Sequence, residues 1–290
     1  MHFRTIHDLN HLISYGLYKI PKDIDLVVGI PRSGMLVASI IALYLNLPLT
    51  DLDSFLSGHI SSCGNTKKRD SWIFDVDKVK KILLVDDTAF SGKAALEARE
   101  KIAKCRFKPD VCFLICYVTS QAKDLPDIYL EVLESPRMFE WNYLHQKNIG
   151  YACFDLDGVL CLNPTKEQND DGPNYLQFLE NAPLRVAPTR EIGHIVTCRL
   201  EKYRSQTEKW LKNNGILYKD LIMMDYESAE ERTLANRDGA FKADVYKRIK
   251  DSWLFIESSP DQADEIAKLS GKMVFCTSNH KVYDYNKTEN

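Results

Sequence analysis

The sequence predicts an α/β protein made of two domains, each organised around a parallel sheet. Short apolar runs recur along the chain, and each is followed by a polar or glycine-bearing loop and then by a helical pattern. This pattern stops in an irregular aromatic segment and restarts at Gly150. A chain of 290 residues is long enough for two domains of ordinary size. The expected domains are residues 1–148 and residues 149–290.

The composition favours a globular protein with no nucleic-acid partner and no membrane span. Hydrophobic residues make up 44% of the chain and charged residues 27%, and the formal net charge is −3. The first ten residues contain no apolar signal core, and no apolar run approaches the length of a membrane span. The eight cysteines show no metal-binding spacing, so we expect free thiols in a reducing compartment. A cytoplasmic location is therefore expected.

The first β-α-β unit opens with the apolar run of residues 26–30. The loop of residues 31–35 follows, and then an apolar helix is predicted over residues 36–45. A glycine in this loop allows close approach of a phosphate, and Arg32 adds a positive charge. Residues 54–74 are polar and irregular, which is typical of a lid or a binding loop.

The next strand carries the most informative stretch of the chain, KILLVDDTAFSGK, over residues 81–93. Its apolar residues predict a buried parallel strand that runs directly into Asp86 and Asp87. A loop of small residues follows, and an alanine-rich helix is predicted over residues 93–104. The free backbone N–H groups and the dipole of such a helix start form an anion site. Two acids beside an anion site suit a ligand with both hydroxyl groups and a phosphate, such as a sugar phosphate.

The second half repeats this organisation with a different set of polar residues. An apolar strand over residues 151–154 leads into Asp155 and Asp157, and the chain turns at the glycine that follows. A second strand, over residues 194–196, leads into Thr197. Alternate residues of a straight strand share a face, and the chain turns after the second acid. Both acids can therefore face one site.

Two later elements of the second half complete this set of polar residues. Lys242 lies at the head of a helical pattern, and the last apolar strand, residues 253–256, ends at Glu257 with Asp261 close behind. A lysine and a metal ion held by such acids would neutralise the charge of a bound phosphate.

Residues 20–135 resemble the type I phosphoribosyltransferases, most specifically in LLVDDTAFSG. The resemblance implies that Asp86 and Asp87 hold the ribose hydroxyls of phosphoribosyl diphosphate, with Mg²⁺ as the cofactor. It also implies that the basic residues 67–69 lie in a mobile hood over the site. The further residues implied in binding phosphoribosyl diphosphate are Arg32, Ser33 and Gly34 in the first loop and Thr88, Ala89, Phe90, Ser91 and Gly92 in the second.

Phe90 departs from the pattern of the purine-using members, which often carry an acid at this place that assists the base. The sugar donor is therefore better supported than a nucleobase acceptor. A hydroxyl acceptor is a weak nucleophile and needs a general base, for which His59 and Glu140 are the candidates.

Residues 150–280 resemble the haloacid-dehalogenase-like phosphatases through FDLDGVL, VTCR, a lysine and a strand that ends in an acid. The resemblance implies that Asp155 is the nucleophile and that Asp157 is first the general acid and then the general base. Thr197 would bind a phosphoryl oxygen, and Lys242, preferred over Lys247 and Lys250, would neutralise charge. The implied magnesium ligands are Asp155, Asp157 and either Glu257 or Asp261.

The two resemblances together imply two Rossmann-like domains, the second with a small or absent cap. The combination resembles bacterial enzyme pairs that transfer 5-phosphoribosyl to a glycan and then remove the 5-phosphate, which installs ribofuranose in polysaccharides. The implied partners are phosphoribosyl diphosphate and a saccharide acceptor, lipid-linked or free, and an oligomer is compatible with the sequence. Two alternatives stay open: a nucleobase transferase fused to a nucleotidase, or a regulator that senses phosphoribosyl diphosphate and has a phosphatase effector.

Overall fold

The computed structural model describes residues 2–61 and 66–285, so part of the loop 54–74 lies outside the described residues. The chain divides into two compact units between Arg137 and Met138. This division precedes the boundary expected after residue 148. Tyr143 is buried, and its ring meets that of Phe275 edge-on at a centroid distance of 5.8 Å. The segment that contains Tyr143 therefore packs as part of the second unit. Within the described ranges, no helix is long and apolar enough to cross a membrane.

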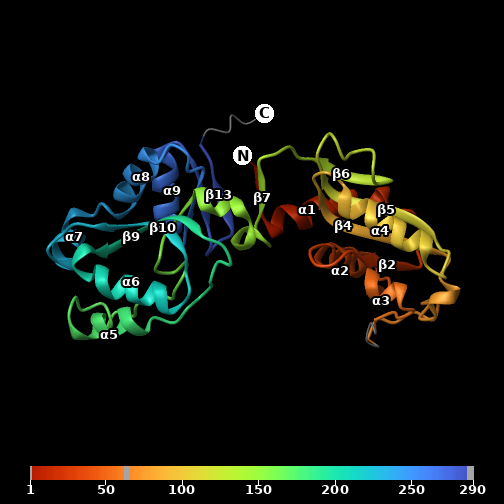
Figure 1. Cartoon of the computed structure of the whole chain (residues 1–290), viewed down its shortest axis with the longest axis horizontal. Coiled ribbons are helices and arrows are strands. Elements are labelled where there is room, and N and C mark those ends of the chain that lie inside the picture. The colour runs from red at the N-terminus through yellow and green to blue at the C-terminus, as the bar shows by residue number, and fades with distance from the viewer. Residues whose placement is uncertain (1, 62–65, 286–290) are drawn as a thin grey trace. The chain divides into compact units, whose positions relative to one another are not determined.

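The first unit is a parallel sheet in the order β3-β2-β4-β5-β6 (Figure 1). Its strands are β2 (Leu26–Gly29), β3 (Leu49–Asp51), β4 (Lys81–Ala89), β5 (Asp110–Val118) and β6 (Ile128–Val132), with the short β1 (His2–Arg4) before them and β7 (Arg137–Phe139) at the division between the units. Its helices are α1 (Ile6–Gly16), α2 (Gly34–Leu45), α3 (Leu52–Leu56) and α4 (Lys93–Lys104).

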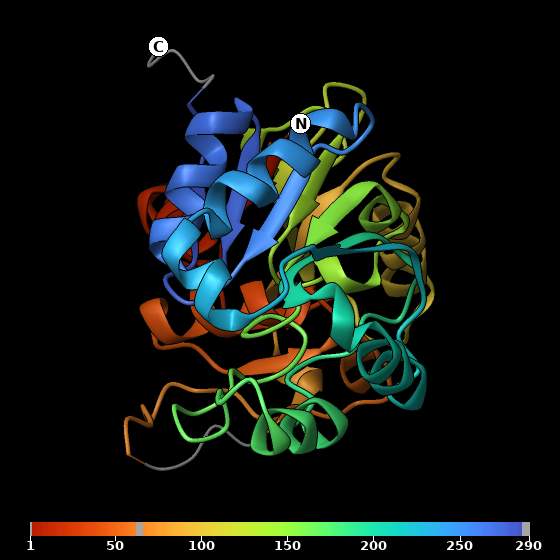
Figure 2. The same ribbon diagram turned by 90° about the vertical axis from the view of Figure 1, so that its left-hand side faces the viewer.

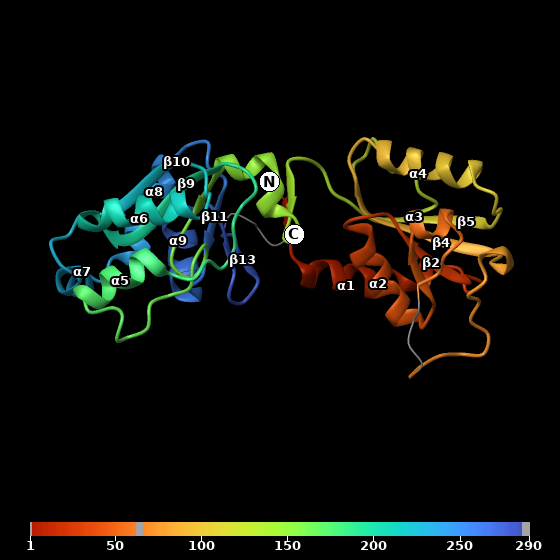
Figure 3. The same ribbon diagram turned by 60° about the horizontal axis from the view of Figure 1, so that its bottom comes forward.

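Helices cover both faces of this sheet, with α1 and α2 on one face and α4 on the other (Figure 1, Figure 3). Alternate strand residues such as Leu84 and Phe113 pack with Ala98 and Ile102 of α4 in one buried cluster. Because both faces are covered, the central strands are apolar throughout, as the sequence predicts. The helix α2 is capped at its C-terminal end by Asn46, whose backbone is left-handed with φ of 51°.

The second unit has a six-stranded sheet in the order β10-β9-β8-β11-β12-β13, in which the edge strand β13 is antiparallel. Its strands are β8 (Ala152–Phe154), β9 (Ile192–Leu200), β10 (Tyr218–Met224), β11 (Leu254–Glu257), β12 (Met273–Cys276) and β13 (Lys281–Tyr283). Its helices are α5 (Pro173–Asn181), α6 (Arg204–Asn213), α7 (Ala229–Ala235), α8 (Asp238–Arg248) and α9 (Pro260–Ser270).

Helices also flank both faces of the second sheet, with α8 and α9 in blue on one side and α6 in teal on the other (Figure 1, Figure 2). Phe255 and Val274 pack with Tyr246 of α8 and Ile266 of α9 in one buried cluster. The structure thus confirms an α/β fold with parallel sheets.

A fragment of residues 138–290 should be more stable than one of residues 149–290, by at least about 2 kcal/mol. The shorter fragment lacks the buried Tyr143 and exposes Phe275. Urea unfolding followed by circular dichroism measures the difference. Tyr143→Ala in the longer fragment should reproduce much of the loss, whereas Tyr151→Ala, at a ring that is 48% exposed, should not. Equal unfolding midpoints for the two fragments would contradict this division of the chain.

Candidate active sites

The polar residues of the first unit gather where β2 ends beside β4. The chain places β3 on one side of β2 and β4 on the other, so its direction across the sheet changes between β2 and β4. Open parallel sheets bind ligands at such a switch point, outside the carboxyl ends of the strands. Gly29 lies opposite Val85 in the register, so the loop after β2 begins next to Asp86.

Gly34 lets the start of α2 lie directly against the acidic pair. A Cβ atom at this position would lie 2.7 Å from the Val85 carbonyl oxygen and 3.1 Å from Asp86 Oδ1. No side chain could be placed there without moving the backbone, so a glycine is required. Ser33 makes no side-chain cap, although the N–H groups of Met35 and Leu36 donate to the carbonyl oxygens of Arg32 and Ser33 at 3.1 and 3.0 Å. Arg32 is exposed beside them.

The loop after β4 is shorter than the residues 88–92 expected from the sequence. Thr88 and Ala89 still pair with Tyr117 and Val118 of β5, so the sheet ladder holds them in β4. Only residues 90–92 connect β4 to α4.

The start of α4 is also free of a side-chain cap. It begins after Gly92, whose φ of 72° is in the left-handed region that favours glycine. Two uncapped helix starts, those of α2 and α4, therefore follow the two strands that border the switch point. Among the described residues, the buried Thr88 hydroxyl has no hydrogen-bond partner, which fits a site that a ligand completes. Ser91 and Phe90 are exposed next to it.

Asp86 and Asp87 are buried together at the end of β4. They are 9% and 4% exposed, and the Asp87 backbone N–H donates to Asp86 Oδ1 at 2.9 Å. Burial and then the adjacent charge of Asp87 raise the pKa of Asp86 to about 8. The protonated form of Asp86 is therefore favoured in the ligand-free site, and hydroxyl donors or a cation of a ligand would stabilise its ionised form.

In this structure the basic segment of residues 67–69 does not lie over this pair, and its role as a mobile hood stays a prediction. The Asn46 side chain donates to the Lys67 carbonyl oxygen at 3.2 Å, and the Trp72 indole donates to the Asn46 carbonyl oxygen at 3.0 Å. Asn46 caps the far end of α2, and a helix of this length spans about 18 Å. These bonds hold the segment at the opposite end of α2 from Asp86.

The two candidate general bases lie in different units. His59 is exposed, and its carbonyl oxygen accepts a hydrogen bond from the Thr50 hydroxyl of β3 at 3.2 Å. Glu140 belongs to the second unit, where it pairs with His280. Of the two, His59 is the one within the unit that contains Asp86.

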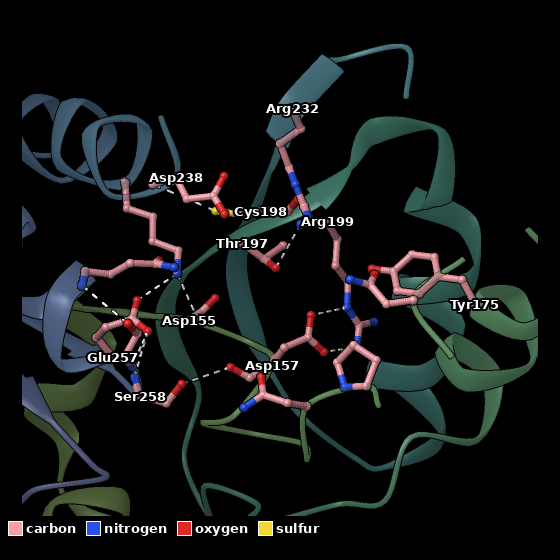
Figure 4. A pocket seen from close by; sticks show the side chains of 16 residues that line it. Asp155, Asp157, Tyr175, Thr197, Cys198, Arg199, Arg232, Asp238, Glu257 and Ser258 are labelled. Carbon is pink, nitrogen blue, oxygen red and sulfur yellow. Dashed lines mark hydrogen bonds and ion pairs between the residues drawn. The ribbon is translucent and has the colours of Figure 1, made fainter. Parts of the chain in front are cut away.

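The second unit has a cavity of about 250 Å³ that brings together the predicted residues of four elements (Figure 4). Asp155 and Asp157 follow β8, Thr197 lies in β9, Lys242 in α8 and Glu257 at the end of β11. The strand β8 has β9 on one side and β11 on the other, so this cavity also lies at a switch point.

Lys242 is the buried centre of an ion cluster in this cavity. Its Nζ lies 2.9 Å from Asp155 Oδ2 and 2.7 Å from Glu257 Oε2, and it donates to Gln262 Oε1 at 2.7 Å. Burial lowers the pKa of Lys242, but the two carboxylates raise it by more. The pKa therefore lies well above its ordinary value, and the ammonium stays charged. Lys242 lies one turn inside α8, which begins at Asp238, and not at the head of the helix as expected.

The same cluster changes the acidity of Asp155. Burial and the charge of Glu257 raise its pKa above the ordinary range, although Lys242 opposes this shift. The Asp155 carboxylate is only 6% exposed and faces the cavity. The pairing with Lys242 favours the ionised form of Asp155.

Asp157 has a different partner, Arg199. The guanidinium donates to both carboxylate oxygens, at 2.9 Å from Nε to Oδ2 and at 2.6 Å from Nη2 to Oδ1. Burial raises the pKa of Asp157, but Arg199 lowers it by more, so the pKa lies below its ordinary value. Arg199 is itself 1% exposed, and the pair is a buried two-pronged salt bridge.

As placed, these residues do not form the expected magnesium site. Asp155 and Glu257 are oxygen donors of the type that Mg²⁺ prefers, but both are paired with Lys242. Among the described residues there is no group of three acid, histidine or cysteine side chains that could hold a metal ion. Asp261 is exposed in the first turn of α9 and does not line the cavity.

Four charged residues that lie at the two sites were not predicted as site residues from the sequence. Arg199 lies within the VTCR stretch, so its place beside Thr197 could have indicated it. Arg232 and Asp238 line the cavity from a polar segment that has no recognisable motif. Arg137, in the first unit, is 8% exposed; burial lowers its pKa, and the charge of nearby Asp87 opposes this.

Comparison with known proteins finds matches for the first unit. Residues 5–146 match the family model of the phosphoribosyl transferase domain. The purine phosphoribosyltransferase of Pyrococcus horikoshii Ot3 is 17% identical, with a TM-score of 0.37, over 48% of this chain and 92% of its own. The Helicobacter pylori xanthine-guanine-hypoxanthine phosphoribosyltransferase is 16% identical, with a TM-score of 0.38, over 48% and 92%. No curated protein matches the chain.

Asp86→Asn should stabilise the ligand-free protein increasingly as the pH rises from 5 to 8. The folded carboxyl keeps its proton up to a pH of about 8, whereas an ordinary aspartate loses it near 3.8, so rising pH between these values favours the unfolded wild type. Thermal unfolding of both proteins across this range, in a metal chelator, measures the effect. The exposed Asp77→Asn serves as the control. A difference between wild type and Asp86→Asn that does not change with pH would contradict the raised pKa.

Proposed function

We propose that this protein is a bifunctional enzyme that transfers 5-phosphoribosyl from phosphoribosyl diphosphate to a saccharide hydroxyl and then hydrolyses the 5-phosphate. The observation that carries the transferase half is the buried pair Asp86 and Asp87 between two uncapped helix starts. This arrangement offers carboxylates to ribose hydroxyls and backbone N–H groups to phosphates, and it lies in the segment that matches the phosphoribosyl transferase domain.

Residues of the first site would stabilise charge rather than react covalently. Loss of diphosphate from ribose C1 leaves positive character on the sugar and negative charge on the leaving group. The start of α2, with Arg32 beside it, faces the place for the diphosphate, and the start of α4 faces the place for the 5-phosphate. A Mg²⁺ ion carried by the diphosphate would add positive charge next to Asp86 and Asp87, and a cation there would favour the ionised form of Asp86, whose pKa is raised in the ligand-free protein.

The phosphatase half is supported by Asp155, buried at a switch point and ion-paired with Lys242. An Asp155 oxygen would attack the phosphorus and displace the ribosyl 5-oxygen, which takes up a proton from water, to form an acyl phosphate. Water would then attack this phosphorus, its proton would pass to Asp157, and phosphate and free Asp155 would result. Arg199 keeps Asp157 ionised, which favours this role as a base and opposes the earlier role as an acid.

A nucleobase acceptor is the second candidate, and the position of Phe90 favours it. The side chain is 59% exposed next to the proposed 5-phosphate loop, where an aromatic ring could stack on a base. An assay of diphosphate release from phosphoribosyl diphosphate decides between the acceptors. Release with saccharide acceptors supports the main proposal, release only with nucleobases refutes the glycan role, and tight binding without turnover indicates a sensor.

Asp155→Asn should lower phosphate release from ribose 5-phosphate at least about 1,000-fold, because the nucleophile is lost. In the coupled reaction, a product that keeps its 5-phosphate should accumulate. Released phosphate and the mass of the product are the measurements, with and without Mg²⁺. The exposed Asp251→Asn is the control. Full hydrolysis by Asp155→Asn would exclude the proposed nucleophile, and loss of transfer in this variant would contradict two independent sites.

The double change of Asp86 and Asp87 to asparagine should abolish transfer and leave hydrolysis of ribose 5-phosphate intact. It removes the carboxylates that would hold the ribose hydroxyls, and both residues lie in the first unit. Calorimetric titration with phosphoribosyl diphosphate and the phosphate-release assay measure the two activities in one preparation. Asp53→Asn with Asp77→Asn, at exposed positions, is the matched double control. Unchanged donor affinity in the Asp86 and Asp87 variant would refute the proposed site.

A further inference from the structure

Arg232 differs from the other two basic residues that line the cavity of the second unit. Lys242 and Arg199 are each engaged by buried carboxylates. In the part of the chain that the structure describes, the Arg232 side chain forms no ion pair. The one hydrogen bond of this side chain runs from Nη1 to the Cys198 carbonyl oxygen at 2.9 Å. Arg232 is therefore a cavity cation whose charge is not matched by a carboxylate.

The charge of the cavity makes this difference important for a phosphate ester. Four acidic and three basic side chains line the cavity, so its formal charge is already negative before an anion enters. A phosphoryl dianion needs a cation, and Lys242 and Arg199 could supply one only by weakening pairs that hold buried carboxylates. The guanidinium fork of Arg232 has donors left for phosphoryl oxygens.

We infer that Arg232 is a substrate-binding residue of the second unit and that it binds the phosphoryl group of the substrate. The inference rests on the proposed phosphatase function and deepens it. Arg232 supplies the charge that the paired Lys242 cannot, and so it sets the affinity for phosphate monoesters.

The geometry of the cavity agrees with this role. Cys198 lies between Thr197 and Arg199 in β9, so the bond to its carbonyl oxygen holds the guanidinium at the end of that strand. In Figure 4 the Arg232 side chain points from α7 toward Thr197 and Arg199, on the side of the cavity away from Glu257. The phosphoryl group would thus lie between Arg232 and the Asp155 nucleophile.

Asp171 fixes the helix that carries Arg232. Its Oδ2 accepts from the Ala229 backbone N–H at 3.0 Å and from Lys202 Nζ at 2.9 Å, and its Oδ1 accepts from the Tyr203 hydroxyl at 2.7 Å. Ala229 is the first residue of α7, so these bonds tie the helix start to the body of the unit. Arg232 is therefore placed before a substrate arrives, which lowers the ordering cost of binding.

Calorimetric titration with inorganic phosphate tests the inference without turnover, in full-length protein that carries Asp155→Asn. Adding Arg232→Gln should weaken phosphate binding about 10- to 100-fold, because a charged hydrogen-bond donor is lost. Arg232→Lys should restore part of the affinity. Arg237→Gln is the matched control, since Arg237 is 61% exposed, pairs with Asp244 at 3.7 Å and does not line the cavity. Thermal unfolding checks that each variant is folded.

Unchanged phosphate affinity in the Arg232→Gln protein would overturn the inference, and so would the absence of phosphate binding in every variant. With Asp155 intact, Arg232→Gln should raise KM for ribose 5-phosphate by a similar factor, with a smaller change in kcat. A failure of the phosphatase proposal is distinguishable: the wild type would not hydrolyse ribose 5-phosphate, while phosphate binding would still depend on Arg232.

Discussion

Both units depend on one constraint, which is that carboxylates stay buried at the carboxyl ends of parallel strands. Asp86 and Asp87 lie in β4 shortly before its end at Ala89, and Asp155 follows β8, in each case at the point where the order of strands reverses. Helix connections diverge there, so the strand ends are not covered by a crossover and a ligand can reach them. A buried carboxylate is costly unless hydrogen bonds or opposite charge compensate it, and the rest of each site follows from how this is achieved.

The elements that carry this constraint could be predicted from the sequence. Buried parallel strands are continuously apolar, so the runs before Asp86 and Asp155 stand out without any knowledge of partners. The helix over residues 93–104 was also predicted with its observed bounds, because a glycine precedes it and its apolar face is regular. The match of residues 5–146 to the phosphoribosyl transferase domain confirms the class suggested by LLVDDTAFSG.

Features set by tertiary contacts could not be predicted in this way. The strand β4 continues to Ala89 because β5 offers a partner at Val118, and no local property of the stretch indicates this. The basic residues 67–69 lie at the far end of α2 because Asn46 binds the chain there. The division between the units moves to Arg137 because Tyr143 packs on Phe275, more than one hundred residues later in the sequence.

The two sites balance the charge of their buried acids by different means. This difference explains which site residues could not be predicted from the sequence. The first unit presents backbone N–H groups at two helix starts, and such groups leave a signature of glycines and small residues that can be recognised locally. The second unit uses side-chain cations from β9, α7 and α8, which are distant in sequence. Two of these cations are paired with acids of the cavity, since Lys242 pairs with Asp155 and Arg199 pairs with Asp157. The proposed phosphate substrate would require a further cation, and that requirement, not any motif, is what singles out Arg232.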